Sequence, residues 1–418
     1  MESNYTSVGE GLLTGGVKAR IGFMMPDDDQ SSGRRRPLHV LTLTPFYPHA
    51  LDDSQGCFIS DPLSSLSQAG ISNTVLALQP IYRKKHRAAS SIVLAEWIRY
   101  FSLPGIFGLP IAGAFAFASL VSSVRELQQE QRIDLIHAHA TLPAGHAAML
   151  LNSELGLPYV ISVHSQDAFS DEHSRGRVGH WCGRISRRVY QGSKRVICIS
   201  EIVREKVLEK MGSLCRTSVV YNGVDPDMFA PDQTNGAQGL NILSVGNLLP
   251  TKGHDVLIRA VAAILPEFPG ATLDLIGHGP EMPRLQQLAQ EFGIHDRVRF
   301  LGRLSRRHVA EAMRRCAVFA LPSGYEGLGC VYLEAMSTGK PAIGCRGQGI
   351  AEIICQGVNG FLIGPGNDKE LVLVLGMLLR DERKRHDIGV AARDTILERF
   401  TLKQQAENLA RIYRECAA

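Results

Sequence analysis

Short apolar runs alternate with helix-like segments through most of the chain. The first run, residues 38–43, ends at a turn marked by Pro45 and Pro48, and a helical pattern then opens at Gly56. Near-continuous apolar strands separated by helices are typical of a parallel sheet covered on both faces. This pattern predicts further strands at residues 74–78, 135–139, 159–163, 196–200 and 219–221.

The composition changes at residues 225–239, where Asp, Pro, Asn, Gln and Gly dominate, and a second series of apolar runs follows. We therefore predict an α/β fold of two doubly wound, Rossmann-like domains joined by this linker. Ligands should bind at the carboxyl ends of the strands, in the cleft between the domains. The second series predicts strands at residues 240–245, 271–276, 298–301, 318–321, 341–344 and 360–363, with helices at 252–264 and 282–291 among them.

The length of 418 residues also favours two domains, because one hydrophobic core rarely extends over so long a chain. We assign residues 37–230 to the first domain and residues 240–395 to the second. Residues 1–36 lack a sustained period and are expected to form a mobile extension. A helical pattern at residues 400–413 predicts a terminal helix in the last segment, residues 396–418.

One apolar segment, residues 103–122, allows three interpretations. It contains no charged residue and is apolar enough to suggest a membrane span. Several prolines and glycines interrupt it, which favours a core helix with its loop instead. A surface that touches a membrane or binds an acceptor is the third interpretation.

The net charge is small, because 45 Lys and Arg against 41 Asp and Glu give +4. This argues against nucleic acid as a partner. Basic residues cluster at residues 34–36 and 83–87; the second run would suit an anionic acceptor or a lipid surface, and a solvated loop is the simpler explanation. The residues of this run to which we give an acceptor-side role are Arg83, Lys84 and Lys85.

The nine cysteines include no CxxC pair and no zinc-type spacing. Several, such as Cys198 and Cys345, lie in apolar runs and are interpreted as buried thiols of a reducing compartment. The N-terminus has no charged region followed by an apolar one, so a signal peptide is not evident. We expect a cytoplasmic protein.

The stretch from Pro322 to Met336 follows an apolar strand and opens a helix. A turn of small residues at a helix N-terminus exposes unpaired backbone N–H groups, which favours binding of an anion such as a pyrophosphate. Glu326 and Glu334 bracket this predicted site, the first in the loop and the second in the helix.

This Glu-x7-Glu element, followed by Leu-Glu-Ala-Met and by Gly339-Lys340-Pro341, resembles the signature of family 4 of the retaining glycosyltransferases, which have the GT-B architecture. The resemblance covers nearly all of the chain after residue 36. The chain is similar to bacterial enzymes that build extracellular polysaccharide or teichuronic acid. Further matching blocks lie at residues 222–225, 245–253, 276–281 and 349–352.

The resemblance implies a donor site in the second domain. Glu326 would contact hydroxyls of the donor sugar and Glu334 the nucleotide ribose, because a carboxylate can accept from two vicinal hydroxyls. Lys252 would hold the diphosphate together with Asn247, which stands where the family more often has Arg and which carries no charge. The remaining expected donor contacts are Gly277 and the N–H groups of Gly327, Leu328, Gly329 and Cys330.

In the first domain the resemblance implies that Gly56 brings backbone close to the donor phosphate. It also implies that His164, at the carboxyl end of a strand, faces the donor sugar. We assign catalytic roles to His164, Glu326 and Lys252. The structural alternatives are a core histidine for His164, and ordinary helix-terminal or surface charges for the glutamates and Lys252.

His137 and His139 alternate on one strand, which puts both rings on one face. They would suit a metal pair, but no third ligand cluster accompanies them and the resemblance implies a metal-independent enzyme. We expect His139 near the acceptor cleft and no cofactor. Asp27–Asp29 is similar to the acidic metal motif of the other glycosyltransferase fold, and we interpret it as a solvated acidic run.

We therefore predict a retaining glycosyltransferase that moves a hexosyl-type sugar from a nucleotide sugar, UDP by family frequency, to a glycan or lipid-linked acceptor. Contact with the inner face of a membrane is part of this prediction, and the terminal helix would cross back to the first domain. A dehydrogenase is disfavoured because Gly277-His278-Gly279 lacks the third glycine of the dinucleotide motif. A sugar-nucleotide epimerase and a non-catalytic protein that retains the fold remain as alternatives.

Overall fold

The computed structural model describes residues 36–50, 52–84, 95–164, 176–212, 215–232 and 239–417. Every element below belongs to the unit Pro37–Ala418. The extension predicted at residues 1–36 lies outside the described residues apart from Arg36. The acidic run Asp27–Asp29 and Lys85 also lie outside them.

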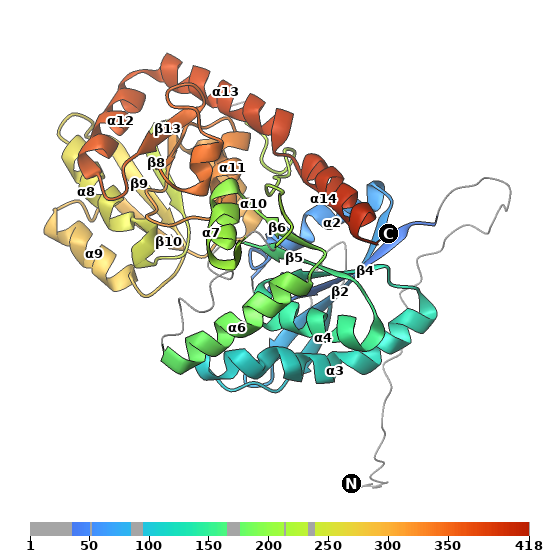
Figure 1. The fold of residues 1–418 in the computed structure, drawn as a ribbon. Coiled ribbons are helices and arrows are strands. Elements are labelled where there is room, and N and C mark those ends of the chain that lie inside the picture. The colour runs from blue at the N-terminus through green and yellow to red at the C-terminus, as the bar shows by residue number, and fades with distance from the viewer. Residues whose placement is uncertain are drawn as a thin grey trace, which may run out of the picture. The chain divides into compact units, whose positions relative to one another are not determined.

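A seven-stranded parallel sheet forms the first lobe (Figure 1). Its strand order is β3-β2-β1-β4-β5-β6-β7, so the direction of winding reverses between β1 and β4. Every residue of β4 and β5 is buried, because helices cover both faces of these central strands, and this explains their uninterrupted apolar runs. The strands are β1 Leu38–Thr44, β2 Ile71–Pro80, β3 Ala95–Tyr100, β4 Leu135–His139, β5 Tyr159–Val163, β6 Arg195–Cys198 and β7 Thr217–Val219.

Two strands of this sheet differ from the prediction. β3 was not predicted, because it is an edge strand whose exposed Glu96 and Arg99 interrupt the apolar pattern. β7 ends at Val219, where the predicted strand began, and its residues are only partly buried. Edge strands have one neighbour and an exposed face, so their sequences carry a weaker signal.

The helices of the first lobe include the ambiguous apolar segment. Residues 103–122 form a short 3-10 turn, η1 Ile106–Gly108, and the first half of α3 Leu109–Glu130. The residues Ala112, Ala116 and Leu120 of α3 form a buried stripe at helical spacing. No helix in the described part of the chain is long and apolar enough to cross a membrane. The other helices are α1 Cys57–Ser60, α2 Pro62–Gln68, η2 Thr141–Gly145, α4 His146–Leu155, α6 Gly176–Gly192 and α7 Glu201–Met211.

A six-stranded parallel sheet forms the second lobe, with the order β10-β9-β8-β11-β12-β13 and a reversal between β8 and β11. Its strands are β8 Leu240–Val245, β9 Ala271–Ile276, β10 Val298–Gly302, β11 Val318–Ala320, β12 Ala342–Cys345 and β13 Gly360–Ile363. Its helices are η5 Pro250–Lys252, α8 His254–Ile264, α9 Met282–Glu291, α10 Arg306–Arg315, α11 Cys330–Ser337, η6 Gly349–Glu352, α12 Asp368–Arg380 and α13 Glu382–Arg399. Two doubly wound α/β sheets confirm the predicted fold class.

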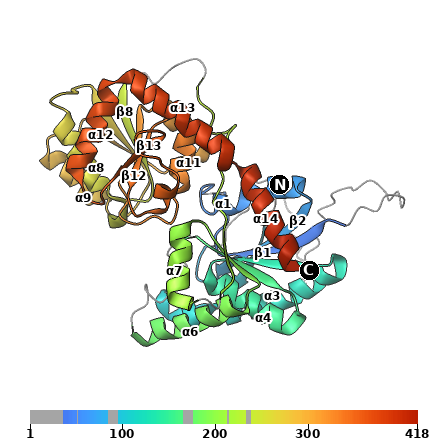
Figure 2. The same ribbon diagram turned by 45° about the horizontal axis from the view of Figure 1, so that its top comes forward.

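The last helix, α14 Leu402–Ala417, packs beside α2 of the first lobe (Figure 1) and lies away from the second sheet (Figure 2). Leu409, Ile412 and Tyr413 of this helix join a core cluster with Val40 and Leu63. The C-terminal residues therefore complete the hydrophobic core of the first lobe.

Candidate active site

Lys252 and Glu326 come from the two loops that flank the reversal point of the second sheet. One loop follows β8 and the other follows β11, so both start at the carboxyl ends of neighbouring parallel strands, from which the chain continues toward opposite edges of the sheet. The ammonium group of Lys252 donates to the carboxylate of Glu326. The two side chains keep 19% and 15% of their surface exposed, so the ion pair is sheltered yet accessible to a ligand. The structure thus brings together two of the three predicted catalytic residues.

The loop that carries Glu326 is braced on both sides. The side chain of Gln348 accepts from the backbone N–H of Glu326 at 2.8 Å and donates to the carbonyl of Gly324 at 3.0 Å. Ser200, from the first lobe, donates its hydroxyl to the carbonyl of Gly327 at 2.6 Å. Because carbonyl groups of the loop are held from outside, its N–H groups keep a defined direction.

Helix α11 begins directly after this loop with a glycine in the left-handed region. Gly329 has φ of 81°, and a Cβ there would lie 2.6 Å from the ring of Tyr332. A glycine has no side chain that could cap the helix, and within the described residues we find no acceptor for the N–H groups of Gly327, Leu328, Gly329 and Cys330. The helix N-terminus therefore presents several unused donors, as an anion site requires.

The thiol of Cys330 lies at the start of this helix without adding negative charge. Burial raises the pKa of Cys330 to about 12, and the side chain of Asn222 donates to its sulfur at 3.2 Å. A neutral thiol does not repel an anion bound at the helix N-terminus.

Asn247 and Gly277 border the same edge of the sheet. Asn247 is exposed on the loop after β8, while Gly277 follows β9 with φ of 145°. A Cβ at Gly277 would lie 1.9 Å from the carbonyl oxygen of Gly246, so only glycine permits the two loops to approach this closely. The amide of Asn247 is available to a ligand beside Lys252, although it brings no charge.

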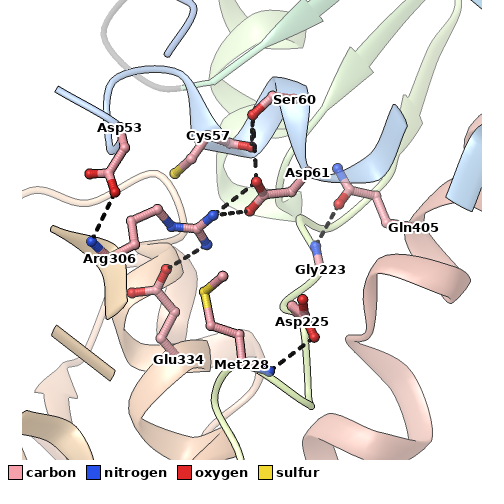
Figure 3. A network of polar contacts seen from close by, with 10 residues as sticks. All are labelled: Asp53, Cys57, Ser60, Asp61, Gly223, Asp225, Met228, Arg306, Glu334 and Gln405. Carbon is pink, nitrogen blue, oxygen red and sulfur yellow. Dashed lines mark hydrogen bonds and ion pairs between the residues drawn. The ribbon is translucent and has the colours of Figure 1, made fainter. Parts of the chain in front are cut away.

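Glu334 is 8% exposed within α11 and contacts a residue that the sequence did not single out. Arg306, at the start of α10, lies 3.6 Å from one carboxylate oxygen of Glu334 and 2.8 Å from the carboxylate of Asp61 in the first lobe (Figure 3). Burial raises the pKa of Glu334, whereas the guanidinium of Arg306 lowers it. Glu334 is thus a sheltered carboxylate with a cationic partner.

The first lobe contributes a cluster of three histidines at the carboxyl ends of β4 and β5. Nδ1 of His139 lies 2.9 Å from Nε2 of His164, and the two rings are stacked with centroids 5.2 Å apart. The ring of His137 packs on His139 at 4.1 Å and bonds the hydroxyl of Tyr413 at 2.6 Å. These histidines line one pocket together with Asn222, Gln405 and Tyr413.

All of the resolved shifts in this cluster favour neutral imidazoles. Burial lowers the pKa of His137 to about 3, and burial together with the neighbouring rings lowers the pKa of His139 well below its usual value. A neutral ring can accept as well as donate a hydrogen bond, so the ring of His139 suits a contact with a sugar hydroxyl.

Gly56 caps helix α1, which contacts the histidine cluster. It has φ of 73°, and a Cβ would lie 2.6 Å from the carbonyl carbon of Phe46, so the turn into α1 requires glycine. Phe58, two residues further on, packs against the ring of His164 with centroids 4.5 Å apart.

Among the described residues, the basic run is hydrogen-bonded to other residues of the first sheet and not to the predicted site residues. Arg83 and Lys84 are exposed after the end of β2, where their carbonyls accept from the side chains of Arg99 and Gln79. Lys85 lies outside the described residues.

Sequence reasoning missed Arg306, Asp61 and the role of Glu352. Glu352 accepts from the N–H groups of Glu201 and Ile202 at 2.8 Å each, and therefore caps helix α7 of the first lobe from the second. Its place in a block that matches the family was a signal, although not for this role. Arg306 and Asp61 are 245 residues apart, and nothing local in the sequence relates them.

Two family models match the chain, "Glycosyltransferase Family 4" over residues 63–228 and "Glycosyl transferases group 1" over residues 232–395. The chain belongs to the family 4 glycosyltransferases. A curated relative described as an uncharacterized glycosyltransferase of Methanocaldococcus jannaschii is 28% identical over 292 residues, which cover 70% of this chain and 78% of that protein.

Solved structures agree on the fold of this glycosyltransferase. Sucrose-phosphate synthase from Thermosynechococcus elongatus superposes with a TM-score of 0.74 at 19% identity, over 90% of this chain and 98% of that one. HepE of Anabaena in complex with UDP-glucose superposes with a TM-score of 0.71 at 21% identity, over 90% and 100%. Both likenesses support the GT-B architecture.

Within the described residues, no group of three or more His, Cys, Asp or Glu is arranged to hold a metal ion.

Proposed function

We propose that this glycosyltransferase transfers a hexosyl group from a UDP-sugar to a glycan or lipid-linked acceptor, with retention of configuration and without a metal or cofactor. The observation that carries the proposal is the Lys252–Glu326 pair beside the unused N–H groups at the start of α11. A cation and a helix N-terminus suit a diphosphate, and a carboxylate suits sugar hydroxyls. UDP is favoured because the similarly folded HepE is solved with UDP-glucose.

Stabilising the departing diphosphate is the main chemical task in this proposal. Cleavage of the anomeric C–O bond builds positive charge on the sugar and negative charge on the diphosphate. Lys252, Asn247 and the N–H groups of residues 327–330 would stabilise that negative charge in a sheltered site. The leaving phosphate would take the acceptor proton during attack on the same face, so retention requires no dedicated protein base.

His164 and Glu326 would hold the donor sugar between the lobes. His164 is half-buried beside His139, and its ring suits a sugar hydroxyl or the ring oxygen. Glu334 would bind the ribose from within α11, and Gly56 would bring the backbone of the first lobe close to the phosphates. Exclusion of water by these groups would protect the donor from hydrolysis.

The acceptor would be anionic or attached to an anionic membrane surface. Arg83 and Lys84 are exposed, and Phe107, within the apolar segment 103–122, leaves 69% of its surface exposed. Helix α6 adds a second basic surface, because its solvent-facing side carries four arginines and its sequence contains no acidic residue. Such surfaces suit an acidic glycan or the inner leaflet of a membrane. The arginines of α6 are Arg177, Arg184, Arg187 and Arg188.

A thermal-shift panel of UDP, GDP and ADP sugars tests the donor assignment. A ligand that binds the native state raises the melting temperature by mass action, and we expect one UDP-sugar to stand out. Radiolabelled sugar from that donor should then appear on a lipid or glycan fraction, and NMR of the product should show the anomeric configuration of the donor.

The first mutational prediction concerns the two residues proposed to bind the diphosphate and the donor sugar. Lys252→Ala and Glu326→Gln should each remove most of the donor-induced shift, because each deletes a charge from the site. Arg307→Ala is the control, since Arg307 is 87% exposed and pairs only with Glu311 of its own helix among the described residues. If both site variants keep the full shift, the donor site lies elsewhere.

A further inference from the structure

Arg306 lies between a carboxylate of each lobe. Its guanidinium approaches Asp61 of the first lobe at 2.8 and 2.9 Å and Glu334 of the second lobe at 3.6 Å (Figure 3). The three side chains keep only 14%, 18% and 10% of their surface exposed. One cation is therefore shared by two sheltered carboxylates that belong to different lobes.

This arrangement leaves Glu334 able to bind a ligand. The 3.6 Å contact is longer than a hydrogen bond, whereas the contacts of Arg306 with Asp61 have hydrogen-bond length. Arg306 thus makes its shorter contacts with the first lobe and a longer one with Glu334. The carboxylate of Glu334 keeps acceptor positions that ribose hydroxyls can fill.

Two further contacts between the lobes lie at or just before the start of α10. The carboxylate of Asp53 accepts from the backbone N–H of Arg306 at 3.2 Å, and Asp52 pairs with Arg303 at 2.7 Å. Arg303 is 59% exposed, so solvent screens its ion pair far more than that of Arg306. The sheltered bridge is expected to dominate the coupling between the lobes.

We propose that Arg306 is a positioning residue that couples recognition of a nucleoside diphosphate to closure of the two lobes: it turns Glu334 toward the ribose and, through Asp61, ties the first lobe over the donor. The proposal rests on the donor site proposed above. Lysine cannot replace arginine here, because a single ammonium group lacks the fork that meets Asp61 and still faces Glu334.

The experiment compares Arg306→Met, Arg306→Lys and Asp61→Asn with the unaltered enzyme in two measurements. Calorimetric titration with UDP gives the Kd, and small-angle scattering with and without UDP gives the change in radius of gyration on binding. We expect Arg306→Met and Arg306→Lys to raise the Kd on the order of tenfold. Asp61→Asn should leave the Kd within about threefold, since it keeps the Arg306–Glu334 contact, but should reduce the change in radius.

Matched controls separate the possible outcomes. Arg303→Ala removes the exposed ion pair with Asp52 and should behave as the unaltered enzyme in both measurements. If Lys252→Ala abolishes UDP binding while all Arg306 and Asp61 variants match the unaltered enzyme, the coupling is refuted and the donor site stands. If the unaltered enzyme binds no UDP or other nucleoside diphosphate, the proposed function itself fails. Circular dichroism of each variant identifies loss of folding.

Discussion

At the scale of single residues, burial determines which side chains carry charge. His137 is 2% exposed and bonded to Tyr413 and Ser162, and burial lowers its pKa to about 3. His254, at the start of α8, is 2% exposed and its pKa is lowered to about 4, with Lys252 adding to the effect of burial. Both rings are neutral in the folded protein at pH values where exposed histidines take up protons.

These histidines predict a loss of stability in acid. Between about pH 6.5 and pH 4 the unfolded chain binds protons that the folded chain does not, so the free energy of unfolding falls as pH falls. Each such group contributes up to about 1.4 kcal/mol per pH unit in this window. Above pH 7 both states are neutral and the contribution is constant.

Urea unfolding at pH 7.5, 6.0 and 5.0 measures this contribution. His137→Gln should lower stability at pH 7.5 yet lose less on acidification than the unaltered protein, because glutamine does not titrate. His295→Gln, at an exposed position, should leave the pH dependence unchanged. Parallel pH dependences for His137→Gln and the unaltered protein would contradict the assignment of a buried neutral ring.

At the scale of elements, the turn into α11 depends on one glycine. Gly329→Ala forces a Cβ to within 2.6 Å of Tyr332 at φ of 81°. We expect a loss of about 1–2 kcal/mol of stability from the left-handed backbone, and a weaker donor affinity because the N–H groups of the loop turn away. Gly324→Ala in the same loop is the control, since its nearest atom would be 3.8 Å away. Equal effects of the two substitutions on unfolding and donor titration would refute this account.

At the scale of the whole molecule, backbone and side-chain contacts join elements of the two lobes. Glu352 caps α7 and also accepts from the hydroxyl of Tyr221 at 2.8 Å. Ser200 both caps α7 and holds the loop that carries Glu326 through the carbonyl of Gly327. Helix α7 is therefore held by a residue of the second lobe, and the loop that carries Glu326 is held by a residue of the first.

Loss of the Glu352 cap should destabilise helix α7 of the first lobe. Glu352→Ala leaves three donors without their acceptor, and we expect a loss of about 1–3 kcal/mol and faster hydrogen exchange in the first turn of α7. Glu352→Gln keeps one carbonyl oxygen, so its loss of stability should be smaller than that of Glu352→Ala. Glu201→Ala, which removes only an exposed pair with Arg204, is the control. Unchanged exchange in α7 of Glu352→Ala would show that the cap contributes little.

Local patterns predicted most of the fold, and the family resemblance predicted two side chains that the structure brings together. The strands at residues 135–139 and 159–163 were predicted with their observed bounds, because a fully buried strand must be apolar along its whole length. Lys252 and Glu326 were found from family blocks on either side of a reversal point, and the two side chains meet. The roles of Arg83 and Lys84 stayed ambiguous, because exposed residues are only weakly constrained by packing. The apolar segment was ambiguous in the sequence, and the structure shows that most of it lies in a helix with a buried stripe.

By itself, the sequence determined the order of strands and helices, the position of the glycine turn before α11 and the family of the enzyme, since these follow from periodicity, conformational freedom and contiguous motifs. Only the tertiary structure decided that Tyr413 completes the histidine cluster, that Glu352 caps a helix of the other lobe and that Arg306 faces both Asp61 and Glu334. These contacts join residues far apart in the chain, and their energies depend on burial that exists only after the lobes have formed.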